Sequence, residues 1–100
     1  MKKAWFGPLF VLVAATGPAA AGDAALGAQK AAVCAACHGA TGSSVNPGWP
    51  SLAGQPATYI VNQLKQFQQS TRTNPLMTPM AAPLSEADMG DLAAHFSQQT

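Results

Sequence analysis

Apolar side chains recur at intervals of three to four residues in two parts of this chain, which is the spacing that one face of an α-helix presents to a core. In the first part, the apolar positions are Tyr59, Ile60, Leu64 and Phe67. Pro56 precedes them, and proline is well tolerated in the first turn of a helix, where its missing N–H is not needed. The pattern predicts a helix that begins near Pro56 and ends near Ser70.

The second apolar stripe lies towards the carboxyl end of the sequence, and its members are Met89, Leu92, Ala93 and Phe96. Ser85 is a good N-cap, because its hydroxyl can accept a hydrogen bond from a free N–H of the first turn. Glu86 and Asp88 then place negative charge in that turn, where it interacts favourably with the helix dipole. A last helix is therefore predicted to begin at Ser85.

A third helix is predicted from about Asp23 to the two cysteines, because Asp23 can cap it and Ala, Leu, Gln and Lys fill it. Residues 39–55 are rich in Gly, Ser, Pro and Asn and are predicted to form an irregular loop. Residues 71–84 contain Pro75, Pro79 and Pro83, so we expect neither a helix nor a central strand there. No segment alternates as a strand does, and the sequence predicts an all-α domain with three main helices.

The first 21 residues have the organisation of a secretory signal peptide. Two lysines follow the initial methionine, residues 4–15 form a short apolar run, and three alanines at 19–21 provide a small-residue cleavage signal. The alternative is a retained membrane anchor, but the run is well short of the roughly 20 residues that a membrane-spanning helix needs. We predict a signal peptide over residues 1–21 and, over residues 22–100, one domain exported to the periplasm without a membrane span.

Composition limits what such a domain can be. The 100 residues carry five Lys+Arg and four Asp+Glu, so no charged patch favours nucleic acid as a partner. Nearly half of the residues (48%) are apolar, but many of these are alanines, which bury little area each. Small domains with few large apolar side chains usually need a staple such as a disulfide or a metal. A covalently attached cofactor would meet that need by forming the core itself.

The sequence Cys34-Ala35-Ala36-Cys37-His38 has the C-x-x-C-H pattern of covalent haem attachment. On a helical turn, positions i, i+3 and i+4 share one face. Two thiols on that face can each add to a vinyl group of a porphyrin, and the histidine can reach the iron. The pattern therefore predicts one haem c, bound through Cys34 and Cys37, with His38 as an axial iron ligand.

Cysteine pairs with this spacing also occur in three kinds of site that fit the chain less well. A thioredoxin-like redox pair belongs beside a βαβ pattern, which the sequence does not show. Structural zinc usually takes four Cys and His ligands, and outside the motif the chain offers only His95. A disulfide is reasonable in an exported protein, but a bridge over so short a loop adds little stability.

An iron with histidine on one side takes a second ligand, usually Met or His, or stays open to small molecules. Met89 and His95 lie on the predicted last helix, which has its own packing to satisfy. Met77 and Met80 lie in the proline-rich segment, whose extended backbone can cross the open face of a haem. The residues by themselves leave Met77 and Met80 as alternatives.

Together these features resemble a class I cytochrome c of the small bacterial periplasmic branch. The matching stretches are 33–39, 50–55, 77–80, 84–88 and 91–96, with Tyr59 and Leu64 between them. The resemblance implies a small cytochrome c fold, in which three main helices wrap around one haem. It also implies Met77 as the second axial ligand, with Met80 as the runner-up, and the backbone carbonyl of Pro50 as the acceptor for the other ring N–H of His38.

The resemblance also concerns the packing of the first and last helices. It implies that the first and last helices cross closely, with the ring of Phe96 over Gly27. Trp49 and Tyr59 either reach a haem propionate or belong to the core, and both alternatives stay open at this point.

An iron with two protein ligands has no vacant position for a substrate. The resemblance therefore implies an electron carrier that exchanges single electrons with periplasmic or membrane-bound redox proteins, and not an enzyme. One alternative is a haem subunit of a periplasmic oxidoreductase, such as a sulfur-compound dehydrogenase, or of a terminal oxidase complex. Another is a five-coordinate haem that binds a gas or peroxide.

Overall fold

The computed structural model describes Gly7 and residues 22–100, so the predicted signal peptide, Gly7 apart, lies outside the described residues. The described residues form helices and turns and no strand. The helices are α1 (Ala24–Lys30), α2 (Ala32–His38), α3 (Ala57–Gln68), α4 (Met77–Ala81) and α5 (Glu86–Ser97). The prediction of an all-α fold is confirmed. None of these helices is long and apolar enough to cross a membrane.

The first and last helices begin as the sequence predicts. The Asp23 carboxylate accepts hydrogen bonds from the N–H groups of Ala25 (2.9 Å) and Leu26 (3.1 Å) and caps α1. At the start of α5, Ser85 and Asp88 form a capping box, in which each side chain accepts from the backbone N–H of the other at 3.0 Å. These bonds satisfy donors that have no partner inside the helix.

Two elements differ from the expectation. The first predicted helix is divided at Ala31, a buried turn residue between α1 and α2. The expectation of no helix in residues 71–84 is wrong, because α4 lies there. Pro79 is the third residue of α4, within the first turn, where its missing N–H would have no helical partner. Pro75 and Pro83 lie outside the helix, so all three prolines are compatible with an element of five residues.

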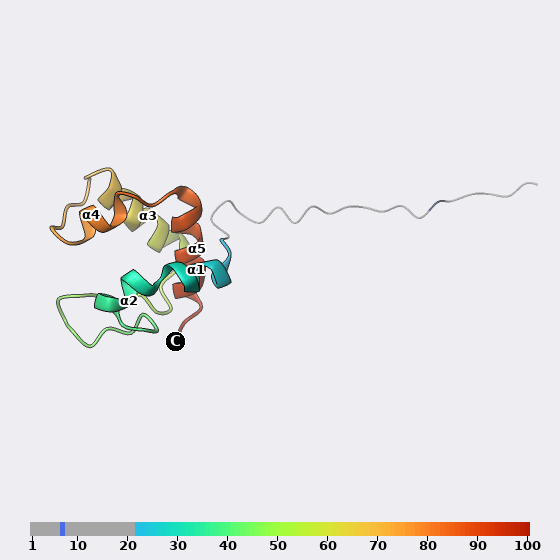
Figure 1. Cartoon of the computed structure of the whole chain (residues 1–100), viewed down its shortest axis with the longest axis horizontal. Helices are drawn as coiled ribbons and strands as arrows, with labels where there is room; N and C mark the ends of the chain where they lie inside the picture. Colours follow the sequence, from blue (N-terminus) through green and yellow to red (C-terminus); the bar gives the residue numbers. More distant parts are fainter. Residues whose placement is uncertain (1–6, 8–21) are drawn as a thin grey trace, which may run out of the picture.

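The helices surround a thin core. α1 packs on α5, while α3 packs on both α5 and α4. In Figure 1, α2 and the loop that follows it lie to one side of the α1–α5 pair, and α3 and α4 lie to the other. The buried cluster consists of Ala31, Ile60, Leu92, Ala93 and Phe96. Among large side chains of the described residues, only Phe96 and Met89 are less than 2% exposed, in keeping with a fold that needs a cofactor as part of its core.

The crossing of α1 and α5 depends on Gly27. A Cβ at this position would lie 1.9 Å from the carbonyl oxygen of Asp91 and 2.8 Å from the Cβ of His95. The predicted close crossing is confirmed, but the nearest side chain belongs to His95 and not to Phe96. Successive residues point about 100° apart around a helix, so neighbouring residues of α5 face different partners. The Phe96 ring lies against Gly42, where a Cβ would come within 2.8 Å of the ring.

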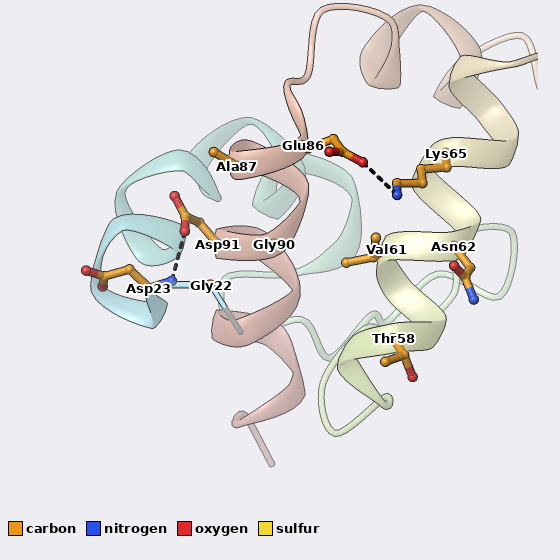
Figure 2. A pocket seen from close by; sticks show the side chains of 10 residues that line it. All are labelled: Gly22, Asp23, Thr58, Val61, Asn62, Lys65, Glu86, Ala87, Gly90 and Asp91. Atoms are coloured by element: carbon orange, nitrogen blue, oxygen red, sulfur yellow. Dashed lines mark hydrogen bonds and ion pairs between the residues drawn. The ribbon is translucent and has the colours of Figure 1, made fainter. Parts of the chain in front are cut away.

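Charged groups strengthen the same crossing. The Nζ of Lys30 lies 2.8 Å from Asp88 and 2.6 Å from Asp91. The Asp91 carboxylate also accepts the backbone N–H of Asp23 at 2.8 Å, a bond that Figure 2 shows. The hydrogen bond from Lys30 is the main cause that lowers the pKa of Asp88 to about 2, and it also lowers the pKa of Asp91. One lysine of α1 thus bridges two carboxylates of α5.

Candidate functional site

α2 directs the three residues of the C-x-x-C-H motif into one cavity. Cys34, Cys37 and His38 all line it, as the i, i+3, i+4 spacing predicts. Neither cysteine is in a disulfide. Cys34 is half-buried, and this burial raises the pKa of its thiol, whereas Cys37 is exposed. The two thiols therefore stand free for a covalent partner inside the cavity.

The imidazole of His38 is fixed by a hydrogen bond on its outer side. His38 is 6% exposed, and its Nδ1 lies 2.6 Å from the backbone oxygen of Pro50. A carbonyl can only accept, so Nδ1 carries the hydrogen and donates it. This tautomer leaves the lone pair of Nε2 free to bind a metal, and the hydrogen bond raises the basicity of the ring. The contact is the one that the family resemblance implied.

The cavity has a volume of about 360 Å³ and lies between α2 with its following loop and α3 with α4. Most of its walls are apolar or aromatic, as is usual in cofactor sites. These wall residues include Val33, Trp49, Leu52, Tyr59, Ile60, Leu64, Phe67, Leu76, Leu84, Leu92 and Phe96. Trp49 and Tyr59 both line the cavity, and Tyr59 is 48% exposed.

Both candidate methionines line the wall that α4 forms. Met77 is the first residue of α4 and is half-buried, whereas Met80 is 41% exposed. Met89 is 1% exposed and buried elsewhere on α5, and neither Met89 nor His95 is among the residues around the cavity. The structure therefore brings together the two cysteines, His38 and the two methionines of the proline-rich segment.

Two amide side chains hold α4 in place, and neither is among the residues expected from the sequence. The Oδ1 of Asn74 accepts the N–H groups of Leu76 (2.9 Å) and Met77 (3.0 Å). At the other end, the Nε2 of Gln68 lies 2.6 Å from the carbonyl oxygen of Leu84. The pattern Asn-Pro-x-x-Thr at 74–78 is a signal of a capped turn that could have revealed the first contact, because Asn is a preferred cap. No sequence signal marks Gln68, which looks like an ordinary polar residue of a helix.

A second hollow, of about 700 Å³, lies on another face of the molecule and is shown in Figure 2. Its walls are the start of the described chain, one side of α3 and the first turns of α5. It contains no cysteine, histidine or methionine, and an ion pair between Lys65 and Glu86 (2.8 Å) spans it. It lacks the ligands that the motif calls for, so the chemistry belongs to the cavity beside α2.

The residues around the cavity beside α2 fit a covalently attached haem. They supply two free thiols, an imidazole whose Nε2 is available and a thioether on the facing wall. Within residues 22–100, no group of three or more Cys, His, Asp or Glu side chains is arranged so that it could hold a metal ion by itself. An iron at this site would therefore be held by its porphyrin together with axial side chains.

The domain is all-α, and one turn of helix presents two thiols and an imidazole to a largely apolar cavity. These features define the class of protein that is built around a covalently attached porphyrin. The sequence model of the family described as cytochrome c matches residues 24–100, which is more than half of the chain. The chain belongs to the cytochrome c family. It carries haem c, and Cys34 and Cys37 fit the attachment motif of that cofactor.

The relatives differ in length. The chain is 49% identical over 80 residues to cytochrome c4 of Pseudomonas aeruginosa, an alignment that covers 80% of this chain and 40% of that protein. It is 45% identical over 82 residues to cytochrome c-554(548) of Halomonas halodenitrificans, which covers 79% of this chain and 99% of the relative. The chain thus spans about two fifths of the cytochrome c4 protein and nearly all of the shorter relative.

A solved structure and a named electron acceptor extend the comparison. The crystal structure of reduced recombinant cytochrome c4 from Pseudomonas stutzeri superposes with a TM-score of 0.76 at 43% identity, covering 80% of this chain and 47% of that one. This match confirms the cytochrome c fold. A protein named thiosulfate dehydrogenase electron acceptor, from Thiomonas intermedia, is 46% identical over 71 residues, which cover 69% of this chain and 32% of that protein.

Proposed function

We propose that this cytochrome c is a periplasmic carrier of single electrons whose haem iron has His38 and Met77 as its axial ligands. The observation that supports the proposal is the convergence of Cys34, Cys37, His38 and Met77 on one largely apolar cavity. When bound, the haem supplies a one-electron couple. Ligation on both faces leaves no position for a substrate, which favours a carrier over an enzyme.

The protein residues set the properties of that couple. The His38 imidazole is oriented by Pro50, so its ring cannot turn when the charge at the site changes. A thioether ligand raises the reduction potential relative to a second imidazole. The apolar walls exclude water and limit the rearrangement that accompanies each electron transfer. The half-exposed Tyr59 marks a side where the cavity approaches solvent.

The choice of Met77 over Met80 is supported by burial, because Met77 is half-buried and Met80 is 41% exposed. In oxidised haem proteins, a weak absorption band at long wavelength reports a bond between methionine sulfur and ferric iron. We expect Met77→Ala to abolish this band in the haem-loaded protein and Met80→Ala, the matched control, to keep it. Survival of the band in Met77→Ala and its loss in Met80→Ala would reverse the assignment.

The proposed location and partners follow from the export signal and from the relatives. Residues 1–21 would direct export and be removed before Gly22, so the partners would be periplasmic or membrane-bound redox proteins. Expression with the natural leader, followed by mass spectrometry of the periplasmic fraction, tests whether the chain is exported and where it is cleaved. A mass equal to residues 22–100 plus one haem is expected, and an uncleaved chain in the membrane fraction would contradict the proposal.

A second candidate function is that of a haem subunit in an oxidoreductase complex, favoured by the relative named thiosulfate dehydrogenase electron acceptor. A permanent partner would co-purify with the chain, whereas a free carrier would be a monomer that several partners reduce and oxidise. A five-coordinate haem is the outcome that both proposals exclude. Ready binding of carbon monoxide to the reduced protein at neutral pH would show that the iron lacks its second ligand.

A further inference from the structure

We infer that Gln68 and Asn74 are positioning residues that hold the Met77 segment closed over the cavity and thereby set how often the iron loses its sulfur ligand. The inference rests on the proposed ligation by Met77. It concerns residues that do not coordinate anything themselves. Each contacts one end of α4, the five-residue helix that carries both candidate methionines.

α4 is too short to be stable by itself. A helix leaves four N–H groups and four carbonyls without helical partners, and in five residues these groups are nearly all that the element has. Isolated helices of fewer than about twelve residues are marginal in water. The geometry of Met77 must therefore be imposed by contacts from outside the helix.

Asn74 supplies those contacts at the amino end. Its Oδ1 accepts the N–H groups of Leu76 at 2.9 Å and Met77 at 3.0 Å. Its own backbone N–H donates to Oγ1 of Thr78 at 2.9 Å, and its carbonyl accepts the N–H of Thr78 at 3.0 Å. Four hydrogen bonds thus link Asn74 to the first turn of α4, one of them to the backbone of Met77 itself.

Gln68 supplies the contacts at the carboxyl end. It is the last residue of α3, and its Nε2 lies 3.3 Å from the oxygen of Ala81, 3.3 Å from that of Ala82 and 2.6 Å from that of Leu84. The amide has two hydrogens, so it is shared among three carbonyls, with Leu84 the closest. These carbonyls lie where α4 ends and α5 is about to begin, and one side chain therefore ties α4 to the neighbouring helix.

Loss of these contacts would shift the population from the closed form, in which Met77 is bound to the iron, towards an open form in which it is not. When Met77 leaves the iron, its segment must move away from the cavity, and the two amide contacts cannot survive that movement intact. Loss of a typical intramolecular hydrogen bond changes such an equilibrium about twofold to tenfold, and the exposed contacts of Asn74 belong at the lower end because water can replace them. An external ligand binds only the open form, so its apparent dissociation constant falls in proportion as the open fraction rises.

The test measures cyanide affinity and the long-wavelength band in the haem-loaded ferric protein. Gln68→Leu removes the amide contacts and is expected to bind cyanide about tenfold more tightly than the parent, with a weaker band. Asn74→Ala loses the two Oδ1 bonds and keeps both backbone bonds, so a smaller gain, about threefold, is expected. Gln68→Lys keeps N–H donors at a similar length, and Asn74→Asp keeps the accepting oxygen, so both should resemble the parent. Gln69→Leu, at the exposed neighbouring position that follows α3, is the matched control.

The outcomes separate this inference from the proposed function. If the parent protein lacks the long-wavelength band, ligation by Met77 fails and the inference fails with it. If the parent has the band but Gln68→Leu and Asn74→Ala bind cyanide as the parent does, only the positioning role is refuted. If Gln68→Leu does not retain haem, the comparison of Asn74→Ala with Asn74→Asp decides, because only the second of these variants keeps the accepting oxygen.

Discussion

Replacement of Gly27 by alanine is a sharp test of the helix crossing that organises this domain. A Cβ at Gly27 would lie 1.9 Å from the Asp91 carbonyl oxygen, whereas ordinary contact begins at 3.4 Å. The two helices would therefore have to separate by about 1.5 Å, the difference between these distances. A gap of that size forfeits more than about half of the dispersion attraction between the facing atoms.

The magnitude follows from two opposing effects. Overpacking costs about 1–3 kcal/mol, and the upper value applies here because the obstructing atom belongs to backbone, which cannot rotate away. In the opposite direction, alanine stabilises a helix interior by about 1 kcal/mol relative to glycine. We therefore expect Gly27→Ala to lower the free energy of unfolding by about 2 kcal/mol, which corresponds to a fall of roughly 8–16 °C in Tm for a domain of this size.

Guanidinium unfolding of the haem-loaded protein, followed by far-ultraviolet circular dichroism, measures this difference. Ala28→Gly is the matched control, since Ala28 is the exposed next residue of α1 and the change reverses only the helix propensity. The control should lose about 1 kcal/mol. A Gly27→Ala protein at least as stable as its parent, beside a destabilised Ala28→Gly, would show that propensity governs this position and that the crossing is not close.

Two further predictions concern charge and the cofactor. The pKa of Asp88 is lowered from 3.8 to about 2, so its carboxylate stabilises the fold above about pH 4, and this stabilisation is lost as the pH falls towards 2. Lys30→Met should reduce that acid-dependent fall in Tm, and equal acid dependence in the two proteins would contradict the role of the ion pair. Replacement of both Cys34 and Cys37 by alanine should abolish covalent haem, measured by haem staining on a denaturing gel, and leave the chain poorly folded. A compact, helical, haem-free variant would refute the view that the cofactor completes the core.

The parts of the fold that the sequence predicts are those governed by local chemistry. Asp23 and Ser85 cap helices because their side chains reach N–H groups two or three residues away. The buried stripe of α5 was evident from its spacing. The turn at Ala31 was not, because alanine favours helix and only the packing around it shows where the axis changes direction.

The chemical groups of the site were predictable from the sequence, whereas the contacts that hold α4 in place were less so. The spacing of the cysteine motif predicted that its side chains share a face, and the family resemblance implied the contact between His38 and Pro50. The density of prolines in residues 71–84 argues against a helix, but their positions allow α4, because Pro79 falls in its first turn, where a helix tolerates proline. The role of Gln68 depends on carbonyls 13 to 16 residues away, and such contacts leave no trace in a local pattern.

The pairing of α1 with α5 also constrains the order in which the chain can fold. The two helices are far apart in the sequence, and the contacts of Lys30 and Asp23 with Asp91 join residues 61 and 68 positions apart. Closing so long a segment carries an entropic cost that no local contact offsets in advance. We expect a chain that stops before α5 to show no protection of α1 amides from hydrogen exchange. If residues 1–21 direct export as proposed, α1 would stay without its packing partner on the far side of the membrane until α5, the last helix, has also crossed.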